Sequence, residues 1–284
     1  MLAAPWLLAW AACFGQAVSV TDDSGRAVSL ARPAQRIIAL APNLTELAFV
    51  AGGGDRVIGV IRHSDHPAAV RSVPLVGDAF ALNFERIAQL RPDLVLVWQS
   101  GLAQRQREQL RALGLTLYES EIRHVDDIAS TLRRLGVLFG TPQVADAAAT
   151  DVTRRWQALS TRYAGRPPVR VFYQLWHEPL MTLSGDHLIT QAIIACGGVN
   201  VFARLPALTP TVSWEAVAQA DPQVIASARV GTQTRPEGRW DDLPQVDAVK
   251  HQRYALLPPD LLGRMGPRFV DGAQLLCEAI DAAR

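Results

Sequence analysis

The feature of this sequence that most restricts its fold is an internal repeat. Residues 83–95 read NFERIAQLRPDLV, and residues 213–225 read SWEAVAQADPQVI. Each copy gives a helix-capping residue, a glutamate two positions later, a short amphipathic helix, a proline and then an apolar strand. A second pair supports the repeat, because residues 45–57 contain the run AGGG and residues 190–201 contain the run ACGG. The sequence therefore predicts two related α/β lobes with a cleft between them, and such clefts are common ligand sites.

The two pairs of repeated segments are not equally spaced. Glu85 and Glu215 lie 130 residues apart, whereas Gly54 and Gly198 lie 144 residues apart, so the first lobe carries 14 extra residues between its glycine run and its glutamate. This stretch contains the segment RHSDHP at 62–67. Binding residues concentrate on loops held by a rigid scaffold, so an insertion rich in His, Asp and Arg favours a functional role. The alternative is an ordinary solvated loop.

Composition and charge exclude several classes of protein. The chain of 284 residues is long enough for two lobes, and its content of 49% hydrophobic and 19% charged residues is typical of a globular protein. The net charge is +1, and there is no long basic run. We therefore expect no nucleic-acid partner.

The N-terminal segment has the pattern of an export signal. Residues 2–12 are apolar but too few to span a bilayer comfortably, and residues 15–17 offer small side chains for cleavage. The usual basic residues before the apolar region are missing, since the first arginine is Arg26. We therefore expect either a displaced start or absent upstream residues. We predict a signal peptide over residues 1–17 and a periplasmic location. Lipidation of Cys13 is the alternative.

The cysteine count fits export. If Cys13 leaves with the signal peptide, Cys196 and Cys277 remain. An even pair in an oxidising compartment predicts one disulfide, which would fix the C-terminal helix to the second lobe and contribute about 4 kcal/mol. The alternative is two buried free thiols.

Apolar segments and helical patterns alternate along the chain. Strands are predicted at residues 37–40, 57–60, 94–97 and 115–118, and helices at 102–113, 126–139 and 144–163. This order predicts an α/β fold of two lobes, each with a central, mainly parallel sheet flanked by helices. The predicted boundaries are 35–141 for the N-terminal lobe, 142–164 for a single long linking helix and 168–284 for the C-terminal lobe. Because a helix is stiffer than extended strands, we expect little hinge closure.

No catalytic motif is present. The sequence has no Gly-x-Ser-x-Gly elbow, no phosphate loop and no dinucleotide fingerprint. His63 and His66 could contribute to a metal site, but two histidines are too few for a complete one. We therefore predict a protein that is not an enzyme and that has neither a catalytic cofactor nor a metal centre. A metal-ion binder and an unrecognised enzyme are the alternatives.

Several segments resemble periplasmic vitamin B12-binding proteins, which feed an ABC importer and belong to the helical-backbone substrate-binding protein superfamily. The matching segments are 40–47 (LAPNLTEL), 64–67 (SDHP), 83–87 (NFERI), 91–95 (RPDLV), 196–202 (CGGVNVF), 212–215 (VSWE) and 274–277 (QLLC). The resemblance covers essentially the whole mature chain. The first segment and the Pro-Asp strand are shared with ferric-siderophore and haem binders, whereas the paired cysteines indicate the B12 branch.

The resemblance implies that cobalamin is carried in the cleft, held mainly by apolar and aromatic contacts with a few polar anchors. The ligand-binding residues that it implies are His63, Asp78, Phe80, Trp98, Trp176, Met181, Asp260 and Arg264. Trp98 matches the family, His63 replaces an aromatic residue, and Ala79 and Thr209 stand where the family can have tryptophans. We expect His63 to pack against the ring edge, since an approach to cobalt requires the corrinoid to lose its axial base. A ferric siderophore or haem is the alternative ligand.

Glu85 and Glu215 occupy the same position in the two repeats, the second residue of a helix. A carboxylate there stabilises its own helix through the helix dipole, which is the local explanation. The resemblance implies a second role, because both match the glutamates that dock onto arginines of two permease subunits. The expected partners of this monomer are therefore a corrinoid and an ABC permease dimer in the inner membrane.

Overall fold

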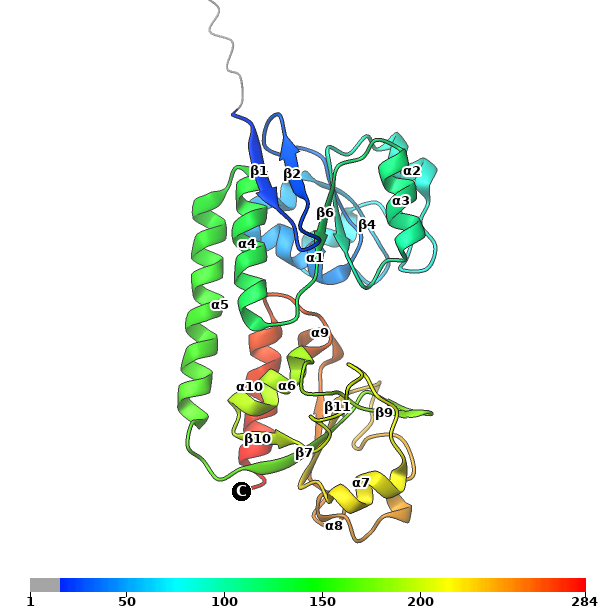
Figure 1. The fold of residues 1–284 in the computed structure, drawn as a ribbon, viewed down its shortest axis with the longest axis vertical. Helices are drawn as coiled ribbons and strands as arrows, with labels where there is room; N and C mark the ends of the chain where they lie inside the picture. Colours follow the sequence, from blue (N-terminus) through cyan, green and yellow to red (C-terminus); the bar gives the residue numbers. More distant parts are fainter. Residues whose placement is uncertain (1–15) are drawn as a thin grey trace, which may run out of the picture.

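The structure, a computed structural model, describes residues 16–284. It has two α/β lobes joined by one long helix, α5 (Pro142–Tyr163), which runs along one side of both lobes (Figure 1). Cys13 and residues 1–15 of the predicted signal peptide lie outside the described residues. The predicted fold class is confirmed.

The N-terminal lobe is built on a four-stranded parallel sheet in the order β4-β3-β5-β6. Its strands are β3 (Ile37–Ala39), β4 (Val57–Val60), β5 (Leu94–Trp98) and β6 (Leu117–Ser120). Its helices are α1 (Pro42–Ala48), α2 (Phe84–Gln89), α3 (Gln104–Ala112) and α4 (Val125–Phe139), with short turns at η1 (Phe49–Gly53), η2 (Gly54–Arg56) and η3 (Ala68–Ser72). Because the strands are parallel, the helices cross over the faces of the sheet and cover them.

The C-terminal lobe repeats this sheet. Its strands are β7 (Val169–Gln174), β10 (Gly198–Asn200), β11 (Val224–Ala228) and β12 (Tyr254–Leu257), in the order β10-β7-β11-β12. If the four strands of each sheet are numbered along the chain, both sheets have the spatial order 2-1-3-4. The helices of this lobe are α6 (Leu188–Ala195), α7 (Trp214–Ala220), α8 (Asp247–Lys250), α9 (Pro259–Leu262) and α10 (Phe269–Asp281), with a short turn at η4 (Trp240–Asp242). The equivalent strand order confirms the two related α/β lobes that the repeated segments predict.

Each lobe also carries a two-stranded hairpin that the other lacks. In the N-terminal lobe, β1 (Val18–Thr21) pairs with β2 (Ala27–Leu30) and packs against α4. In the C-terminal lobe, β8 (Trp176–His177) pairs with β9 (Leu180–Met181), and this hairpin comes between β7 and α6 along the chain. This second hairpin follows directly on the carboxyl end of the first strand of its lobe.

The apolar core runs through both lobes. Alternating residues of each sheet point to opposite faces, so Ile37 and Val171 join one large cluster that also includes Val152 and Leu159 of α5. The opposite faces form two separate clusters, one in each lobe. The core therefore continues from lobe to lobe through α5, and little hinge closure stays a prediction.

The ends of α5 follow from its sequence. Gly140 takes a left-handed conformation (φ 69°) after α4, and Pro142 occupies the first turn of α5, where its missing N–H costs nothing. Gly165 (φ 73°) and the two prolines after it end the helix. The chain therefore turns sharply at both ends of α5.

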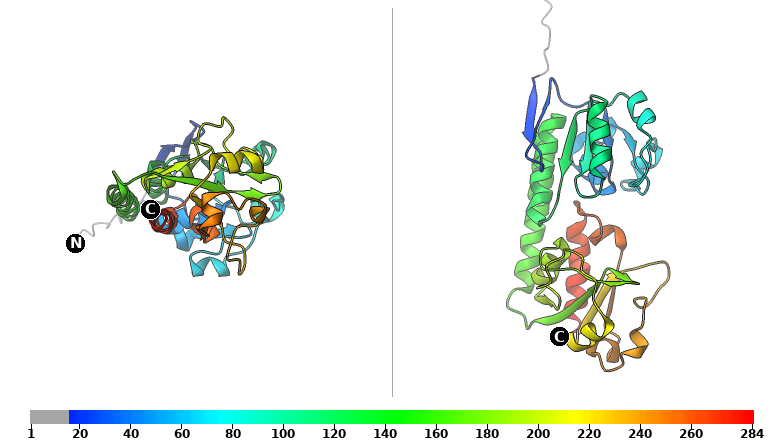
Figure 2. Two further views of the ribbon diagram at one scale, coloured as in Figure 1. Left: turned by 90° about the horizontal axis from the view of Figure 1, so that it is seen from below. Right: turned by 45° about the vertical axis from the view of Figure 1, so that its right-hand side comes forward.

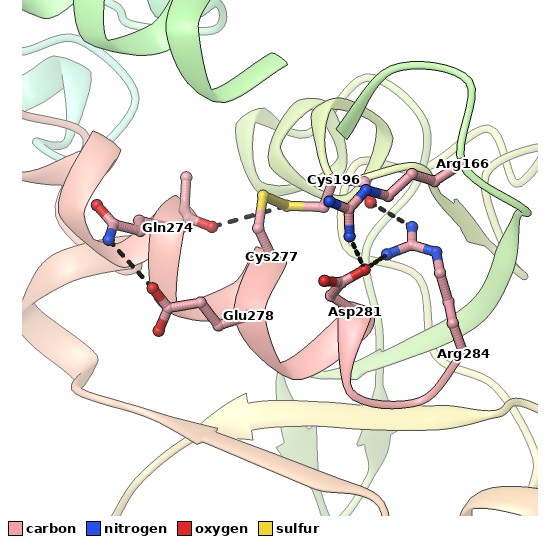
Figure 3. Close-up of a disulfide and its surroundings, with 8 residues drawn as sticks. Arg166, Cys196, Gln274, Cys277, Glu278, Asp281 and Arg284 are labelled. Atoms are coloured by element: carbon pink, nitrogen blue, oxygen red, sulfur yellow. Dashed lines mark hydrogen bonds and ion pairs between the residues drawn. A yellow bond between two sulfur atoms is a disulfide. The ribbon is translucent and has the colours of Figure 1, made fainter. Parts of the chain in front are cut away.

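The predicted disulfide is confirmed. Cys196, directly after α6, is bonded to Cys277 on α10, and the two sulfurs are 2.01 Å apart (Figure 3). Both cysteines are fully buried. Nearby, the Asp281 carboxylate accepts hydrogen bonds from Arg166 and Arg284, which also ties the end of α10 to the segment before β7 (Figure 3). The C-terminal helix is thus fixed to its lobe at two points, by the disulfide and by the hydrogen bonds of Asp281.

Candidate functional site

The carboxyl ends of the two sheets face each other across the boundary between the lobes. Asn43, which follows β3, donates a hydrogen bond from Nδ2 to the Met265 carbonyl, beyond β12, at 3.4 Å. Gln191 on α6 donates to the Arg123 carbonyl, beyond β6, at 3.2 Å. Loops at strand carboxyl ends, the usual binding position in open parallel sheets, therefore meet here (Figures 1 and 2).

Trp98 stands at the carboxyl end of β5 in the N-terminal lobe. Its ring is half-buried and lies over Gly101, where an added Cβ would come within 2.0 Å of the ring. Only glycine allows this close approach, so the local sequence fixes the ring against the end of the sheet. The ring also packs against the large apolar cluster, and part of it stays exposed.

Trp176 stands at the corresponding end of β7 in the C-terminal lobe. Its side chain is 56% exposed, and its Nε1 donates to the Glu178 carbonyl at 2.9 Å. The hairpin places Met181 directly opposite Trp176 in the register, and Met181 is half-buried. The hairpin therefore presents an aromatic and a thioether side chain together, a pair that suits an apolar ligand surface.

The loop at residues 77–82 presents a third aromatic side chain, Phe80, which is 94% exposed. Asp78 Oδ1 accepts hydrogen bonds from the N–H groups of Phe80 (2.9 Å) and Ala81 (2.8 Å), and these bonds lower the pKa of Asp78. Gly77 has φ 134°, and an added Cβ would lie 2.3 Å from the Ala81 carbonyl oxygen. The loop therefore has a fixed conformation, and Asp78 uses Oδ1 to accept hydrogen bonds from the loop backbone.

His63 is exposed on the 14-residue insertion of the N-terminal lobe. It has a left-handed backbone (φ 68°), which is uncommon for a residue with a side chain, and its carbonyl accepts a hydrogen bond from Arg264 at 3.1 Å. The insertion is therefore attached to the opposite lobe through its main chain, while the imidazole faces solvent.

Arg264 and Asp260 belong to a network of charges that crosses the lobe boundary. Arg264 Nη1 donates to Glu46 Oε1 at 3.0 Å and to Asp65 Oδ1 at 2.6 Å. Arg268 spans both oxygens of Glu46, with Nε to Oε2 at 2.9 Å and Nη2 to Oε1 at 2.7 Å, and it also pairs with Asp260 at 2.8 Å. The predicted polar pair is therefore joined through Arg268 and Glu46.

In three members of this network, Arg268, Asp65 and Arg264, the pKa is shifted in the direction that favours the charged form. The hydrogen bond to Glu46 raises the pKa of Arg268, and the hydrogen bond from Arg264 lowers the pKa of Asp65. Burial lowers the pKa of Arg264, but its bonds to Asp65 and Glu46 outweigh burial, so its pKa lies above the usual value. The charged side chains of this network are thus paired with one another at the lobe boundary.

Glu85 and Glu215 are both exposed, in the first turns of α2 and α7. The predicted caps are confirmed: Asn83 Oδ1 accepts from the Arg86 N–H at 2.9 Å, and Ser213 Oγ accepts from the Ala216 N–H at 3.1 Å. Backbone and Ser213 hydrogen bonds lower the pKa of Glu215. Both helices lie on the side of their lobes away from α5 (Figures 1 and 2).

Across residues 16–284, no group of three or more His, Cys, Asp or Glu side chains is arranged to hold a metal ion. None of the helices in that range combines the length and apolar character needed to cross a membrane.

The chain is similar to known proteins over most of its length. A sequence profile described as periplasmic binding protein matches residues 37–261. The chain belongs to the periplasmic binding protein family. A curated relative, the vitamin B12-binding protein of Vibrio cholerae, is 36% identical over 253 residues, which cover 89% of this chain and 91% of the relative.

Two solved structures of periplasmic binding proteins place the fold among known molecules. The periplasmic vitamin B12 binding protein BtuF of Vibrio cholerae superposes with a TM-score of 0.81, at 36% identity, over 88% of this chain and 98% of that one. The periplasmic heme-binding protein RhuT from Roseiflexus sp. RS-1, in apo form, superposes with a TM-score of 0.76, at 25% identity, over 88% and 99%.

Some residues at the lobe boundary of this periplasmic binding protein were missed by the sequence reasoning. Glu46 and Arg268 were not singled out, although a charged residue inside the apolar run LAPNLTELAF was a usable signal. His177 Nδ1 lies 3.1 Å from Glu237 Oε2, beside a cavity of about 100 Å³ at the ends of β7 and β11. Glu119 lies within β6, near its carboxyl end, and is buried.

Proposed function

We propose that this chain is a periplasmic solute-binding protein that captures one corrinoid, cobalamin, between its lobes and delivers it to an ABC permease. The observation that supports this most is the likeness, over 88% of the chain, to a vitamin B12-binding protein, at 36% identity and a TM-score of 0.81. Known relatives of this kind are binding proteins, so we propose no catalytic activity and no catalytic cofactor.

The aromatic side chains at the lobe boundary supply the binding chemistry in this proposal. Trp98 and Phe80 come from the N-terminal lobe and Trp176 from the C-terminal lobe, so a flat macrocycle between the lobes meets an aromatic group on each side. Aromatic contact with a ring system contributes on the order of 1–3 kcal/mol per residue through area burial and stacking. Met181 and His63 extend the apolar and polar parts of this surface.

The polar anchors in the proposal are Arg264 and Asp260. Arg264 is 16% exposed and Asp260 38% exposed, so each keeps some surface for a ligand amide. The rigid charge network behind them would orient these groups without further ordering on binding, which favours affinity.

Delivery in the proposal uses Glu85 and Glu215. Two exposed carboxylates at equivalent positions of two duplicated lobes match a twofold-symmetric permease dimer, because symmetry offers the same partner surface twice. The mature protein would be free in the periplasm after removal of residues 1–17. Lipidation of Cys13 is the other route to the same compartment.

A comparison of ligands by tryptophan quenching tests the proposal. We expect cyanocobalamin to quench the fluorescence of the protein with one-to-one saturation, because Trp98 and Trp176 would contact the chromophore. Haem and a ferric siderophore are the competing ligands, and haem deserves particular care because a heme-binding protein shares the fold. Saturation by haem or by the ferric siderophore, with no response to cyanocobalamin, would overturn the corrinoid proposal.

A further inference from the structure

The most deeply buried charge at the lobe boundary is the carboxylate of Glu46, whose side chain is 2% exposed. It lies on α1 in the N-terminal lobe, yet both arginines that satisfy it, Arg264 and Arg268, come from the C-terminal lobe more than 200 residues later. A carboxylate removed from water is tolerated only while such partners stay in place.

We propose that Glu46 is the positioning residue that sets the spacing of the two lobes, and with it the width of the cleft. The bidentate pair with Arg268 constrains both distance and orientation, because a planar guanidinium donates to both oxygens of a carboxylate only when the two groups lie close together and nearly in one plane. Arg264 adds a third bond to the same carboxylate. Any movement that separates the lobes would leave the buried Glu46 carboxylate without its hydrogen-bond donors.

The outer members of the network extend this positioning to the loops of the cleft. Arg264 also holds Asp65 and the His63 carbonyl, and so fixes the insertion of the N-terminal lobe. Arg268 holds Asp260 on α9 of the C-terminal lobe. One buried carboxylate thereby aligns the loop that carries His63 and the short helix that carries Asp260.

The chain offers a matched control for this proposal. Glu119 on β6 is also buried, with its side chain 3% exposed, and it too is surrounded by arginines. Its partners Arg26, Arg107 and Arg111 all belong to its own lobe. Replacing Glu119 removes a buried ion cluster of the same kind without touching the lobe boundary.

The test measures the distance between the lobes directly. Spin labels are attached through Arg105→Cys on α3 and Lys250→Cys on α8, two exposed positions on different lobes, with the native disulfide kept oxidised. We expect one narrow distance distribution for the parent chain and for Glu119→Gln, and a broadened or displaced one for Glu46→Gln. A narrow, unshifted distribution in Glu46→Gln overturns the proposal.

A second variant keeps the test decisive if Glu46→Gln folds poorly. Arg268→Lys keeps the positive charge but cannot span both oxygens of Glu46. The distribution of spin-label distances should therefore broaden, while the circular dichroism spectrum stays native. An unchanged distance in a folded Arg268→Lys chain counts equally against the proposal.

A ligand measurement extends the inference and rests on the proposed function. Glu46→Gln should weaken cyanocobalamin binding about tenfold, mainly through faster dissociation, whereas Glu119→Gln should not. If the parent chain fails to bind cyanocobalamin, the proposed function fails, while the spin-label distances still decide the role of Glu46. If the parent binds and Glu46→Gln binds equally well, lobe spacing does not control affinity.

Discussion

The two lobes share one scaffold but differ in where they carry extra chain. In the N-terminal lobe, β3 is followed almost at once by α1, and the insertion with His63 and Phe80 comes after β4. In the C-terminal lobe, the hairpin with Trp176 comes after β7, and β10 has no comparable insertion before α7. Both insertions follow the carboxyl end of a strand, at different positions in the repeat.

This difference separates what duplication provides from what was added to it. The strand order, the capped glutamate helices and the shared core are common to both lobes and supply a stable frame. The insertions are not repeated, so they give the two walls different side chains. A ligand between unlike walls meets an asymmetric site, whereas a partner on the helices α2 and α7 meets two equivalent carboxylates.

The largest expected effect concerns the disulfide, which only the C-terminal lobe has. Replacing Cys196 and Cys277 together by Ala should lower the free energy of unfolding by about 4 kcal/mol, because the bond closes a long loop in the unfolded chain. Urea denaturation measures the loss, and reduction of the parent chain should reproduce it. A loss below about 1 kcal/mol would show that packing alone holds α10.

The next effect concerns pH and the start of α6. Burial lowers the pKa of His187 to about 4, and its Nδ1 accepts the Ile189 N–H at 3.1 Å as a helix cap. In the unfolded chain the pKa is about 6.5, so between about pH 4 and pH 6.5 the imidazole is protonated in the unfolded state and neutral in the folded state. Stability is therefore complete above pH ~6.5 and falls by about 3 kcal/mol as the pH drops toward 4.

His187→Asn provides the check on this pH dependence, because asparagine keeps a capping acceptor and does not titrate. Denaturation at several pH values should show a shallower acid loss in the variant. The equivalent helix of the N-terminal lobe, α1, begins at Pro42 without a side-chain cap, so the sensitivity should concentrate in the C-terminal lobe. Identical pH profiles for parent and variant would contradict this account.

A smaller effect in free energy, but a clear one in transport, concerns the two equivalent glutamates. The double variant Glu85→Arg, Glu215→Arg should reduce corrinoid uptake at least tenfold and leave the corrinoid affinity unchanged, because docking charges face like charges after reversal. Uptake of labelled cyanocobalamin measures the first quantity and calorimetry the second.

The matched control for charge reversal is the double variant Glu108→Arg, Glu278→Arg. These glutamates are also exposed, one in each lobe, and each accepts a hydrogen bond from a glutamine four residues earlier. The net charge changes equally, so uptake should stay near the parent value. Equal losses in both double variants would indicate a general charge effect instead of docking.

The smallest effect tests how equivalent the repeated helices are. Asn83→Ala and Ser213→Ala should each cost about 1 kcal/mol, since each removes one side-chain cap from a short helix. Urea midpoints of the two single variants, with the unfolding slope unchanged, give the comparison. Clearly unequal losses would show that the repeats are alike in sequence but not in energetics.

Much of the fold could be predicted because long apolar segments carry their own signal. The strand at 57–60 was predicted with the bounds that the structure has, and the helix ending at Phe139 within one residue. The strand β6 begins and ends two residues later than predicted. The two hairpins were missed; β8 and β9 have two residues each, too few for any alternation to be recognised.

The site was harder to predict for a physical reason. The position of Trp98 at a strand end follows from local pattern alone. The partners of Glu46 are separated from it by more than 200 residues, and neither propensity nor periodicity reports such a contact. The duplicated frame is therefore readable from the sequence, whereas the pairing across the lobe boundary required the structure.

The most direct test of the central claim, that a corrinoid is held by both lobes, is a calorimetric titration with cyanocobalamin of the parent chain, Trp98→Ala and Trp176→Ala. Trp156→Phe, on α5, serves as the control. We expect one site per chain, a loss of affinity of about tenfold or more in each cleft variant and no change in the control. No binding by the parent at concentrations on the order of tens of micromolar, or a loss confined to one lobe, would contradict the account.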